Sequence, residues 1–502
     1  MAVKPTNLTD GRRLARNVCW NIVGAGAPLI IAVIAIPILI NSLGKARFGI
    51  LAIAWMVVGY FSLFDLGIGR ALTKLVAEKL GNEQQNEAPS VIWTAISLMT
   101  VLGLIGAVVV SVLSPWLVES VFKIPLALKQ ETLKSFYVLA LSIPIVILAT
   151  GLRGILEAYQ RFDLVNAVRI PVGSLTFLGP ISVIPFSNSL VALVSILVAI
   201  RLISCFVYAL LCLAVEPKLY RAAGIDFSII RQLFGFGGWM TVTNIIGPVM
   251  VYMDRFLIGA MISMTAVAYY ATPYEVVTKL LIIPGAIMGV MFPAFTTSLH
   301  QTGDRTIQLF SRTVSCLFIA VFPIVLIIVT FSHEGLALWI GNEFADKSSL
   351  VLKILSLGVF LNSHAQVPFG LIQGAGHPDL TAKLHLIELP FYLLLLWWML
   401  DDYGITGAAI AWVLRIATDA LFLYIMAGRL LSPMPLFTHR TILGTIITLL
   451  LIILGGVISG IFIKIIFVIL AMLFFFSAAW FLILASKERE FILNYLKKTS
   501  ER

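Results

Sequence analysis

About fourteen stretches of about 20 mostly apolar residues follow one another along this chain, and no other feature limits its fold more strictly. An α-helix needs that length to cross the hydrocarbon core of a bilayer. Of the 502 residues, 60% are hydrophobic and 12% are charged, whereas a soluble domain carries about 25% charged residues. The sequence therefore predicts an all-α polytopic membrane protein. Its expected spans are residues 17–40, 48–76, 90–113, 132–153, 166–186, 190–215, 229–258, 264–296, 306–331, 348–374, 380–400, 405–430, 440–461 and 463–485.

The distribution of lysine and arginine predicts the topology, because short cytoplasmic loops carry an excess of both residues. With the N-terminus inside, about 23 of these residues fall in cytoplasmic segments and about 8 in external segments. An even number of spans then returns the C-terminus to the cytoplasm. We expect both termini to be cytoplasmic, and the net charge of +10 to reflect topology and anionic lipid headgroups rather than nucleic-acid binding.

A short internal repeat suggests how the spans are grouped. Residues 154–158 (GILEA) align with residues 370–374 (GLIQG), and Asp163 aligns with Asp379. Each stretch joins a fourth and a fifth span on the same side, so the halves are predicted to be parallel repeats about an axis along the membrane normal. The predicted division is 1–215 (six spans), 216–430 (six spans), 431–486 (two further spans) and 487–502 (a cytoplasmic tail).

Sequence signatures of catalysis are absent. The chain has no HExxH, GxSxG or Walker-type motif, and no cysteine–histidine pair at metal-ligand spacing. The adjacent acids Asp401 and Asp402 fit a solvated helix end better than a metal site. We therefore expect no enzymatic activity, no cofactor and no bound metal.

Ionisable residues inside the expected spans are the candidate functional residues, since a charge at bilayer depth costs about 2.5–3.5 kcal/mol on insertion scales. Asp254 and Arg255 are adjacent, so they point about 100° apart on a helix and at least one of them needs a partner on another helix or water. Glu275 with Lys279 are four residues apart on one helix face, as are Arg415 with Asp419. Each of these two pairs could be a neutralised structural ion pair or a site.

Three further positions have two interpretations each. Arg201 has no acidic residue at helical spacing. It could bind a phosphate, because a guanidinium group can donate hydrogen bonds to two phosphate oxygens, or its side chain could extend along the helix to the lipid headgroups. Asp65, beside Gly67 and Gly69, is either a proton or cation site or the cap of a broken helix. His364 and the pair His385–Glu388 could carry a coupling proton, although an interhelical hydrogen bond is the commoner use of such histidines.

Several motifs together resemble the oligosaccharide flippases of the multidrug/oligosaccharidyl-lipid/polysaccharide exporter superfamily. They cover most of residues 15–430, and it is their order and spacing that is specific. The matching pieces are Leu43-Gly44 with Phe48-Gly49, Phe64-Asp65-Leu66-Gly67, residues 154–163 (GILEAYQRFD), residues 254–259 (DRFLIG), Ala268-Tyr269-Tyr270, Pro284, Phe292-Pro293 and residues 403–409 (YGITGAA). A fourteen-span layout also looks like that of lipid II flippases.

The resemblance implies two pseudo-symmetric six-helix lobes in a V shape, plus two C-terminal helices, in a bacterial inner membrane. It implies transfer of a polyprenyl-diphosphate-linked oligosaccharide between leaflets by alternating access. Partners would be the lipid bilayer and the machinery of polysaccharide polymerisation and chain-length control. The site residues expected on this basis are Arg255, Arg201, Lys279 and Arg415 for the diphosphate and glycan, and Asp65, Asp254, Glu275 and Asp419 for H⁺ or Na⁺ coupling and gating. One departure is that the first span carries no Lys or Arg beyond Arg16.

The alternative function within the same fold is a cation-coupled exporter of small molecules or drugs. Such a transporter would bind cations with its carboxylates, whereas a flippase would bind a diphosphate with its cations. A non-transporting scaffold is disfavoured, because a scaffold gains nothing from the cost of buried charges.

Overall fold

The computed structural model describes residues 30–60, 67–81, 86–220, 238–299, 303–430 and 439–480, together with Pro28, Gly224, Asp226 and residues 228–230. These residues form helices and short connections, with no strand among them. The chain forms two compact units, Met1–Thr272 and Pro273–Arg502. The predicted lobe boundaries after residues 215 and 430 rest on the sequence repeat and stay predictions.

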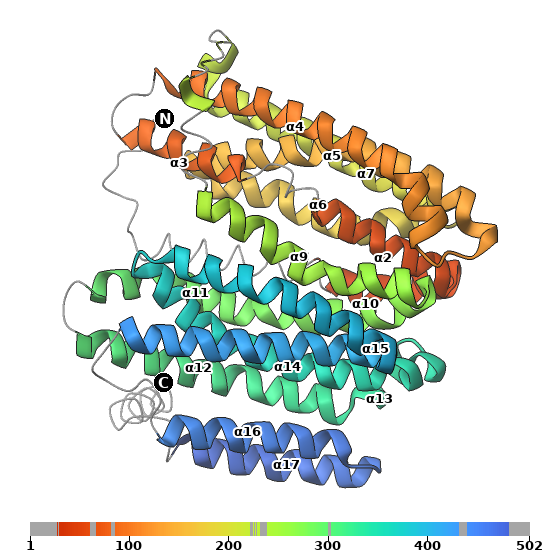
Figure 1. Cartoon of the computed structure of the whole chain (residues 1–502), viewed down its shortest axis with the longest axis vertical. Helices are drawn as coiled ribbons and strands as arrows, with labels where there is room; N and C mark the ends of the chain where they lie inside the picture. Colours follow the sequence, from red (N-terminus) through yellow and green to blue (C-terminus); the bar gives the residue numbers. More distant parts are fainter. Residues whose placement is uncertain are drawn as a thin grey trace, which may run out of the picture. The chain divides into compact units, whose positions relative to one another are not determined.

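The first unit is built from antiparallel helices, several of which run side by side (Figure 1). The central helix is α5, which packs against α2, α3, α4 and α7. The elements are an apolar helix Ile30–Leu43, α2 (Lys45–Tyr60), α3 (Ile68–Gly81), α4 (Ala88–Trp116), the π-helical turn η3 (Leu117–Val121), α5 (Leu126–Ala158), α6 (Phe162–Val183), α7 (Leu190–Val215), the 3-10 turn η4 (Pro217–Tyr220), α9 (Gly238–Met261) and α10 (Met264–Thr278), which continues past Thr272 into the second unit.

Glu131 on α5 joins three helices of the first unit at one end. Its carboxylate accepts hydrogen bonds from the Arg47 side chain, at 3.3 Å from Nη2, and from the backbone N–H of Leu190. Leu190 is the first residue of α7, where unpaired N–H groups and the helix dipole favour a negative charge. A single carboxylate therefore fixes the ends of α2, α5 and α7 against one another.

The second unit is organised around α12, α14 and α15 (Figure 1). α15 is two helices joined at Gly404, whose φ of 58° and ψ of −141° are not helical. The elements are the 3-10 turn η5 (Lys279–Leu281), α11 (Ile282–Leu299), α12 (Gly303–Thr330), α13 (Ser332–Trp339), α14 (Asn342–Gly374), α15 (Pro378–Leu430), α16 (His439–Val457) and α17 (Ile461–Ala478).

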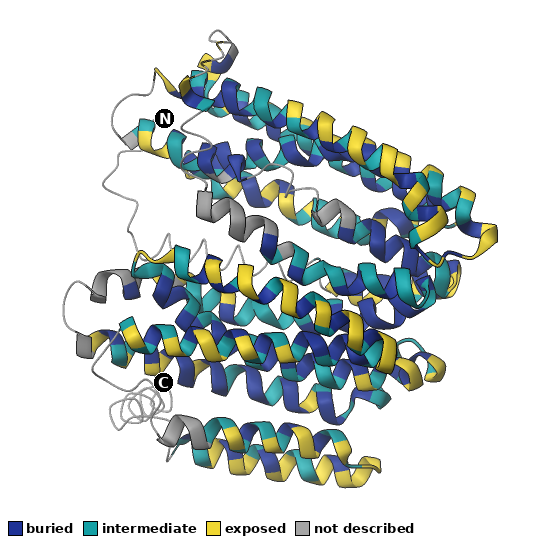
Figure 2. Ribbon diagram, in the orientation of Figure 1, coloured by how far each residue is buried: buried dark blue, intermediate teal, exposed yellow. Residues whose placement is uncertain are grey.

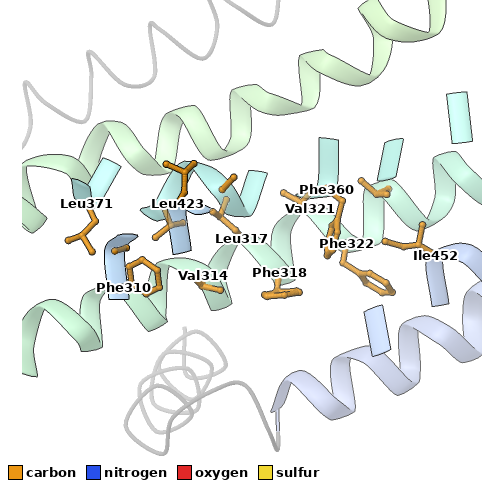
Figure 3. Packing of buried hydrophobic residues seen from close by; sticks show 14 of the residues in the cluster. Phe310, Val314, Leu317, Phe318, Val321, Phe322, Phe360, Leu371, Leu423 and Ile452 are labelled. Atoms are coloured by element: carbon orange, nitrogen blue, oxygen red, sulfur yellow. The ribbon is translucent and has the colours of Figure 1, made fainter. Parts of the chain in front are cut away.

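Aromatic and aliphatic side chains of α12 form the centre of the second unit's core (Figure 3). Phe318 packs edge-to-face on Phe360 of α14, with ring centroids 5.7 Å apart, and Phe322 stacks on Phe475 of α17 at 4.1 Å. The core residues of α12, such as Val314, Phe318 and Val321, recur at three- and four-residue spacing, which places them on one helix face. The C-terminal helix α17 is thus packed directly into this core.

Seven of the described helices are long and apolar enough to cross a membrane, and two shorter apolar helices accompany them. Together with the kink in α15, the element order is compatible with the expected fourteen spans, and the chain is an all-helical, multi-pass membrane protein. Two expected spans are interrupted. Residues 48–76 divide into α2 and α3, and residues 264–296 divide into α10 and α11 at η5. Pro284 explains the second break, because it cannot donate to the carbonyl of Leu280.

Large apolar side chains are exposed along whole helices (Figure 2). On α17, Ile466, Leu470 and Leu473 are among many exposed side chains, and α4 shows the same pattern at Val108 and Val112. A continuous apolar face of this size is unusual on a soluble monomer. It is the surface that a helix presents to lipid.

The C-terminal hairpin, α16 with α17, is attached to the rest of the second unit by two lysines. Lys464 on α17 donates to both carboxylate oxygens of Glu334 on α13, at 2.7 and 2.9 Å. Lys353 on α14 donates to the carbonyl of Gly456 at the end of α16, at 2.7 Å. Both contacts lie at the same end of the hairpin, which is held there by charge and along its length by apolar packing.

Replacing Glu334 by glutamine is expected to loosen this hairpin, because it leaves the ammonium of Lys464, 8% exposed, without its counter-charge. The cost should fall between the ~1 kcal/mol of an exposed ion pair and the ~3–5 kcal/mol of a buried pair broken on one side. Thermal unfolding of the purified protein measures it. The matched control is Asp346→Asn, which breaks the exposed His333–Asp346 pair nearby and should change the unfolding temperature little.

The same contact predicts a pH dependence. Burial raises the pKa of Glu334, but the hydrogen bond and charge of Lys464 outweigh burial and hold that pKa below its usual value. The contribution of the Lys464–Glu334 pair to stability is therefore fully present above the ordinary pKa of glutamate. It is lost as the pH falls through the lower pKa that Glu334 has in the folded protein. An equal destabilisation by Glu334→Gln at acid and neutral pH would contradict this assignment.

Candidate functional site

Asp254 and Arg255 lie deep inside the first unit, on α9. Asp254 is 0% exposed and Arg255 is 2% exposed. The carboxylate of Asp254 accepts a hydrogen bond from the hydroxyl of Tyr270 on α10, at 2.7 Å, and another from the backbone N–H of Arg255, at 2.6 Å. The guanidinium of Arg255 lies 5.4 Å from the ring centre of Tyr252. The expected partner on another helix is therefore confirmed for Asp254.

Arg201 is the third predicted residue described in the first unit, on α7. It interacts electrostatically with Tyr208 two turns along, as do Arg153 of α5 and Arg169 of α6. The hydroxyl of Tyr208 lies 3.4 Å from the carbonyl oxygen of Val165 on α6. Arg201 itself is half-buried, and its two sequence neighbours, Leu202 and Ile203, are exposed apolar side chains. Asp65, the fourth candidate on this unit, lies outside the described residues.

Glu275 and Lys279 form the ion pair that their spacing predicts. Their nearest charged atoms are 3.1 Å apart, and the side chains are 34% and 41% exposed. The pair lies where α10 passes into η5. Because both side chains are half exposed, they are accessible to a ligand as well as to each other.

Arg415 and Asp419, for which the sequence left a structural ion pair and a site open, do not form an ion pair with each other. Asp419 Oδ1 instead lies 3.3 Å from Nε2 of His385 on the other arm of α15. The guanidinium of Arg415 lies 5.5 Å from the ring centre of Tyr392, also on the other arm. Each of the two side chains therefore has a neighbour on the opposite arm of the hairpin.

Glu388 completes a cluster that the sequence prediction did not assemble. The nitrogen and oxygen atoms of His385, Glu388 and Asp419 lie within 4.8 Å of one another. Glu388 is 7% exposed and Asp419 is 8% exposed. We call these three residues the hairpin cluster. A signal for it was present in the sequence: Glu388 lies 16 residues before Gly404 (404 − 388) and Asp419 lies 15 after it (419 − 404), so antiparallel arms bring them to one depth.

The described candidates thus form two separate sets. Asp254, Arg255 and Arg201 belong to the first unit, whereas Glu275, Lys279, Arg415 and Asp419 belong to the second. Within the first set, Asp254 is already satisfied by hydrogen bonds. Within the second, Asp419 belongs to a cluster whose polar atoms are only partly satisfied.

Comparison with known proteins identifies the family. The model of the family described as "Polysaccharide biosynthesis protein" matches residues 14–299, more than half of the chain. The chain is 34% identical over 426 residues to a "Putative O-antigen transporter" of Shigella flexneri, an alignment that covers 84% of this chain and 99% of that protein. It is 26% identical over 197 residues to a "Probable low-salt glycan biosynthesis flippase Agl15" of Haloferax volcanii, covering 39% of this chain and 42% of that protein.

Solved structures show the fold. An inward-facing multidrug resistance transporter of the MATE family, within the MOP superfamily, superposes with a TM-score of 0.69 at 13% identity, covering 82% of this chain and 98% of that one. A MOP superfamily transporter from Pyrococcus furiosus, described as having a binding pocket of reverse polarity, gives a TM-score of 0.63 at 14% identity, covering 86% and 99%. The fold is therefore that of MATE-like transporters, and the chain belongs to the polysaccharide biosynthesis protein family.

Proposed function

We propose that this protein is a flippase that moves a polyprenyl-diphosphate-linked oligosaccharide from the cytoplasmic to the outer leaflet of a bacterial inner membrane. The observation that carries the proposal is the 34% identity to an O-antigen transporter along 99% of that protein's length. The product would serve surface polysaccharide synthesis: O-antigen, capsule or exopolysaccharide. Both termini would be cytoplasmic, as the lysine and arginine distribution predicts.

The barrier to this transfer is desolvation. Each hydroxyl of the glycan that loses its hydrogen bonds in hydrocarbon costs several kcal/mol, and an ionised diphosphate costs far more. A transporter lowers that barrier by offering polar and cationic groups in place of water, alternately to each side. No covalent bond is made or broken, so the protein acts as a transporter and not as an enzyme.

The cations that we assign to the diphosphate are Arg255, Arg201, Lys279 and Arg415. Arginine suits this role because its planar guanidinium donates two parallel hydrogen bonds to phosphate oxygens. Arg255 is 2% exposed here, so we assign its contact with the substrate to another conformation of the transport cycle, in which α9 is accessible. Lys279 is 41% exposed in the present conformation and is available at once.

Energy would come from an H⁺ or Na⁺ gradient, acting through the carboxylates Asp65, Asp254, Glu275 and Asp419. Of these, Asp254 already accepts two hydrogen bonds and Glu275 is paired with Lys279, whereas Asp419 lies beside His385 and a second buried carboxylate, Glu388. Polymerase and chain-length proteins would take up the product in the outer leaflet.

Deletion of the gene tests the function. We expect the polyprenyl-diphosphate glycan to accumulate in the cytoplasmic leaflet and surface polysaccharide to be lost, with both restored by the wild-type gene. The alternative is a cation-coupled exporter of drugs, since a multidrug resistance transporter of the MATE family shares this fold. Unchanged delivery of the glycolipid together with increased drug sensitivity would support that alternative and overturn the flippase.

A further inference from the structure

The hairpin cluster combines close approach with deep burial. His385 and Glu388 lie one turn apart on the first arm of α15, and Asp419 reaches them from the second arm. The Nε2 atom of His385 is 3.3 Å from Asp419 Oδ1. Among the residues that the structure describes, neither oxygen of Glu388 has a hydrogen-bond partner, although that residue is only 7% exposed. A buried carboxylate without a partner is costly in its ionised form.

The charges around Glu388 can be counted. The charged groups that act on it are Asp419 and Arg415, both on the second arm. On α14, which packs against α15, the ring of Phe369 stacks on His385 with centroids 6.3 Å apart. The ionisable residue of α14 nearest this region is His364, whose Nδ1 is hydrogen-bonded to the Phe360 carbonyl and whose own carbonyl lies 3.5 Å from the Tyr424 hydroxyl.

This count leaves a deficit of one positive charge. With both carboxylates ionised, Arg415 charged and His385 neutral, the group carries a net charge of −1 inside an apolar helical hairpin. A buried charge left without a counter-charge is strongly destabilising, so one further positive charge is favoured. A divalent ion would overshoot to +1 beside the fixed guanidinium. Sodium would have to replace water with oxygen ligands, whereas one of the three groups here is an imidazole.

We propose that the hairpin cluster is a one-proton site, with the proton held by Glu388 as a neutral carboxylic acid beside the Asp419–His385 pair. The proton leaves when the hairpin becomes hydrated and returns when it is sealed. Proton binding at this site stands on its own geometry. Its use as the coupling ion, in place of Na⁺, rests on the proposed transport function and names the ion for it.

Infrared difference spectroscopy of the full-length protein in nanodiscs tests the site directly, since a protonated carboxyl has a distinct C=O stretch that shifts in heavy water. At neutral pH we expect such a band in the wild type, its loss in Glu388→Gln, and its retention in the control Asp401→Asn. Asp401 lies on the same helix but is exposed. Persistence of the band in Glu388→Gln, or its absence from the wild type, would overturn the proposal.

A second variant uses the charge count itself. Asp419→Asn leaves Glu388 balanced by Arg415 alone, so Glu388 should ionise and the same band should disappear although Glu388 is intact. This variant also serves if Glu388→Gln fails to fold. If the band survives in Asp419→Asn, the charge argument is wrong. If micromolar Zn²⁺ or millimolar Na⁺ removes the wild-type band at neutral pH, the cluster is a metal-ion site and the proton assignment fails.

Transport assays separate this inference from the proposed function. In proteoliposomes with a fluorescent polyprenyl-diphosphate glycan, an imposed pH gradient should change the transport rate of the wild type. In Glu388→Gln the change in rate should be at least tenfold smaller. A wild type that moves no glycolipid but keeps the infrared band would refute the flippase and leave the proton site intact. A wild type that moves glycolipid with no dependence on the pH gradient would refute proton coupling.

Discussion

Arg255→Glu is expected to abolish translocation of the lipid-linked glycan while the protein still inserts into the membrane. The substitution places two carboxylates side by side at positions that are 0% and 2% exposed, where Asp254 and Arg255 now lie. A disrupted buried charge of this kind costs about 3–5 kcal/mol, or roughly 100- to 4000-fold in the population of a working conformation. Complementation of a deletion strain, with membrane-fraction immunoblotting as the check on insertion, measures the effect.

The conservative variant Arg255→Lys separates charge from geometry. It keeps the positive charge beside Asp254 but loses the planar fork, so partial transport is expected from it. The matched control is Arg305→Glu, a charge reversal at an exposed position in the first turn of α12, which should transport normally. Normal transport by Arg255→Glu would contradict the proposal that Arg255 binds the diphosphate.

Gly407→Ala is expected to prevent correct folding of α15. A methyl group at this position would overlap the carbonyl oxygen of Met399, in the turn between the two arms. The two nearest atoms, O and C of Met399, belong to the backbone, so no side-chain rotation can relieve the overlap. The loss of folding free energy should reach or exceed ~3 kcal/mol, the upper range of ordinary overpacking. Yield of monodisperse protein and its unfolding temperature in detergent measure the loss.

The control for this substitution is Gly335→Ala on α13. No atom lies within 4 Å of the position that the added methyl group would occupy there, and an alanine in a helix is favoured over glycine by about 1 kcal/mol. We expect Gly335→Ala to be neutral or slightly stabilising. Equal yields and unfolding temperatures for the two variants would show that the turn can open without loss of the fold.

Most of the fold could be predicted from the sequence, because hydrocarbon imposes a fixed length on each span. The α4, α5 and α7 helices begin and end within a few residues of the expected spans, apart from extensions beyond the apolar stretch. The short helix α13 and the break at η5 could not be predicted in this way. Both depend on local backbone geometry, as at Pro284, and hydropathy averaged over a window of residues does not detect such short breaks.

The sites were less predictable, because helical spacing relates residues on one helix only. Helical spacing predicted the Glu275–Lys279 ion pair correctly, because the two residues are four apart along the chain and the contact needs no other helix. It did not indicate the neighbour of Arg415, whose guanidinium faces Tyr392 of the opposite arm. It related Glu388 to His385 but not to Asp419, which is 31 residues away (419 − 388) and close only after the chain has turned at Gly404.

The turn at Gly404 also has a consequence for biosynthesis. All members of the hairpin cluster, together with Arg415, come from one continuous run of about 35 residues that leaves the ribosome within seconds at the usual rate of 5–20 residues per second. As the two arms enter the translocon as a helical hairpin, Arg415 can balance Asp419 and the proton on Glu388 can neutralise that carboxylate before α16 and α17 have been synthesised. The membrane therefore never has to accept Glu388 or Asp419 as an isolated charge, and nascent chains truncated just after Leu430 should already be integrated.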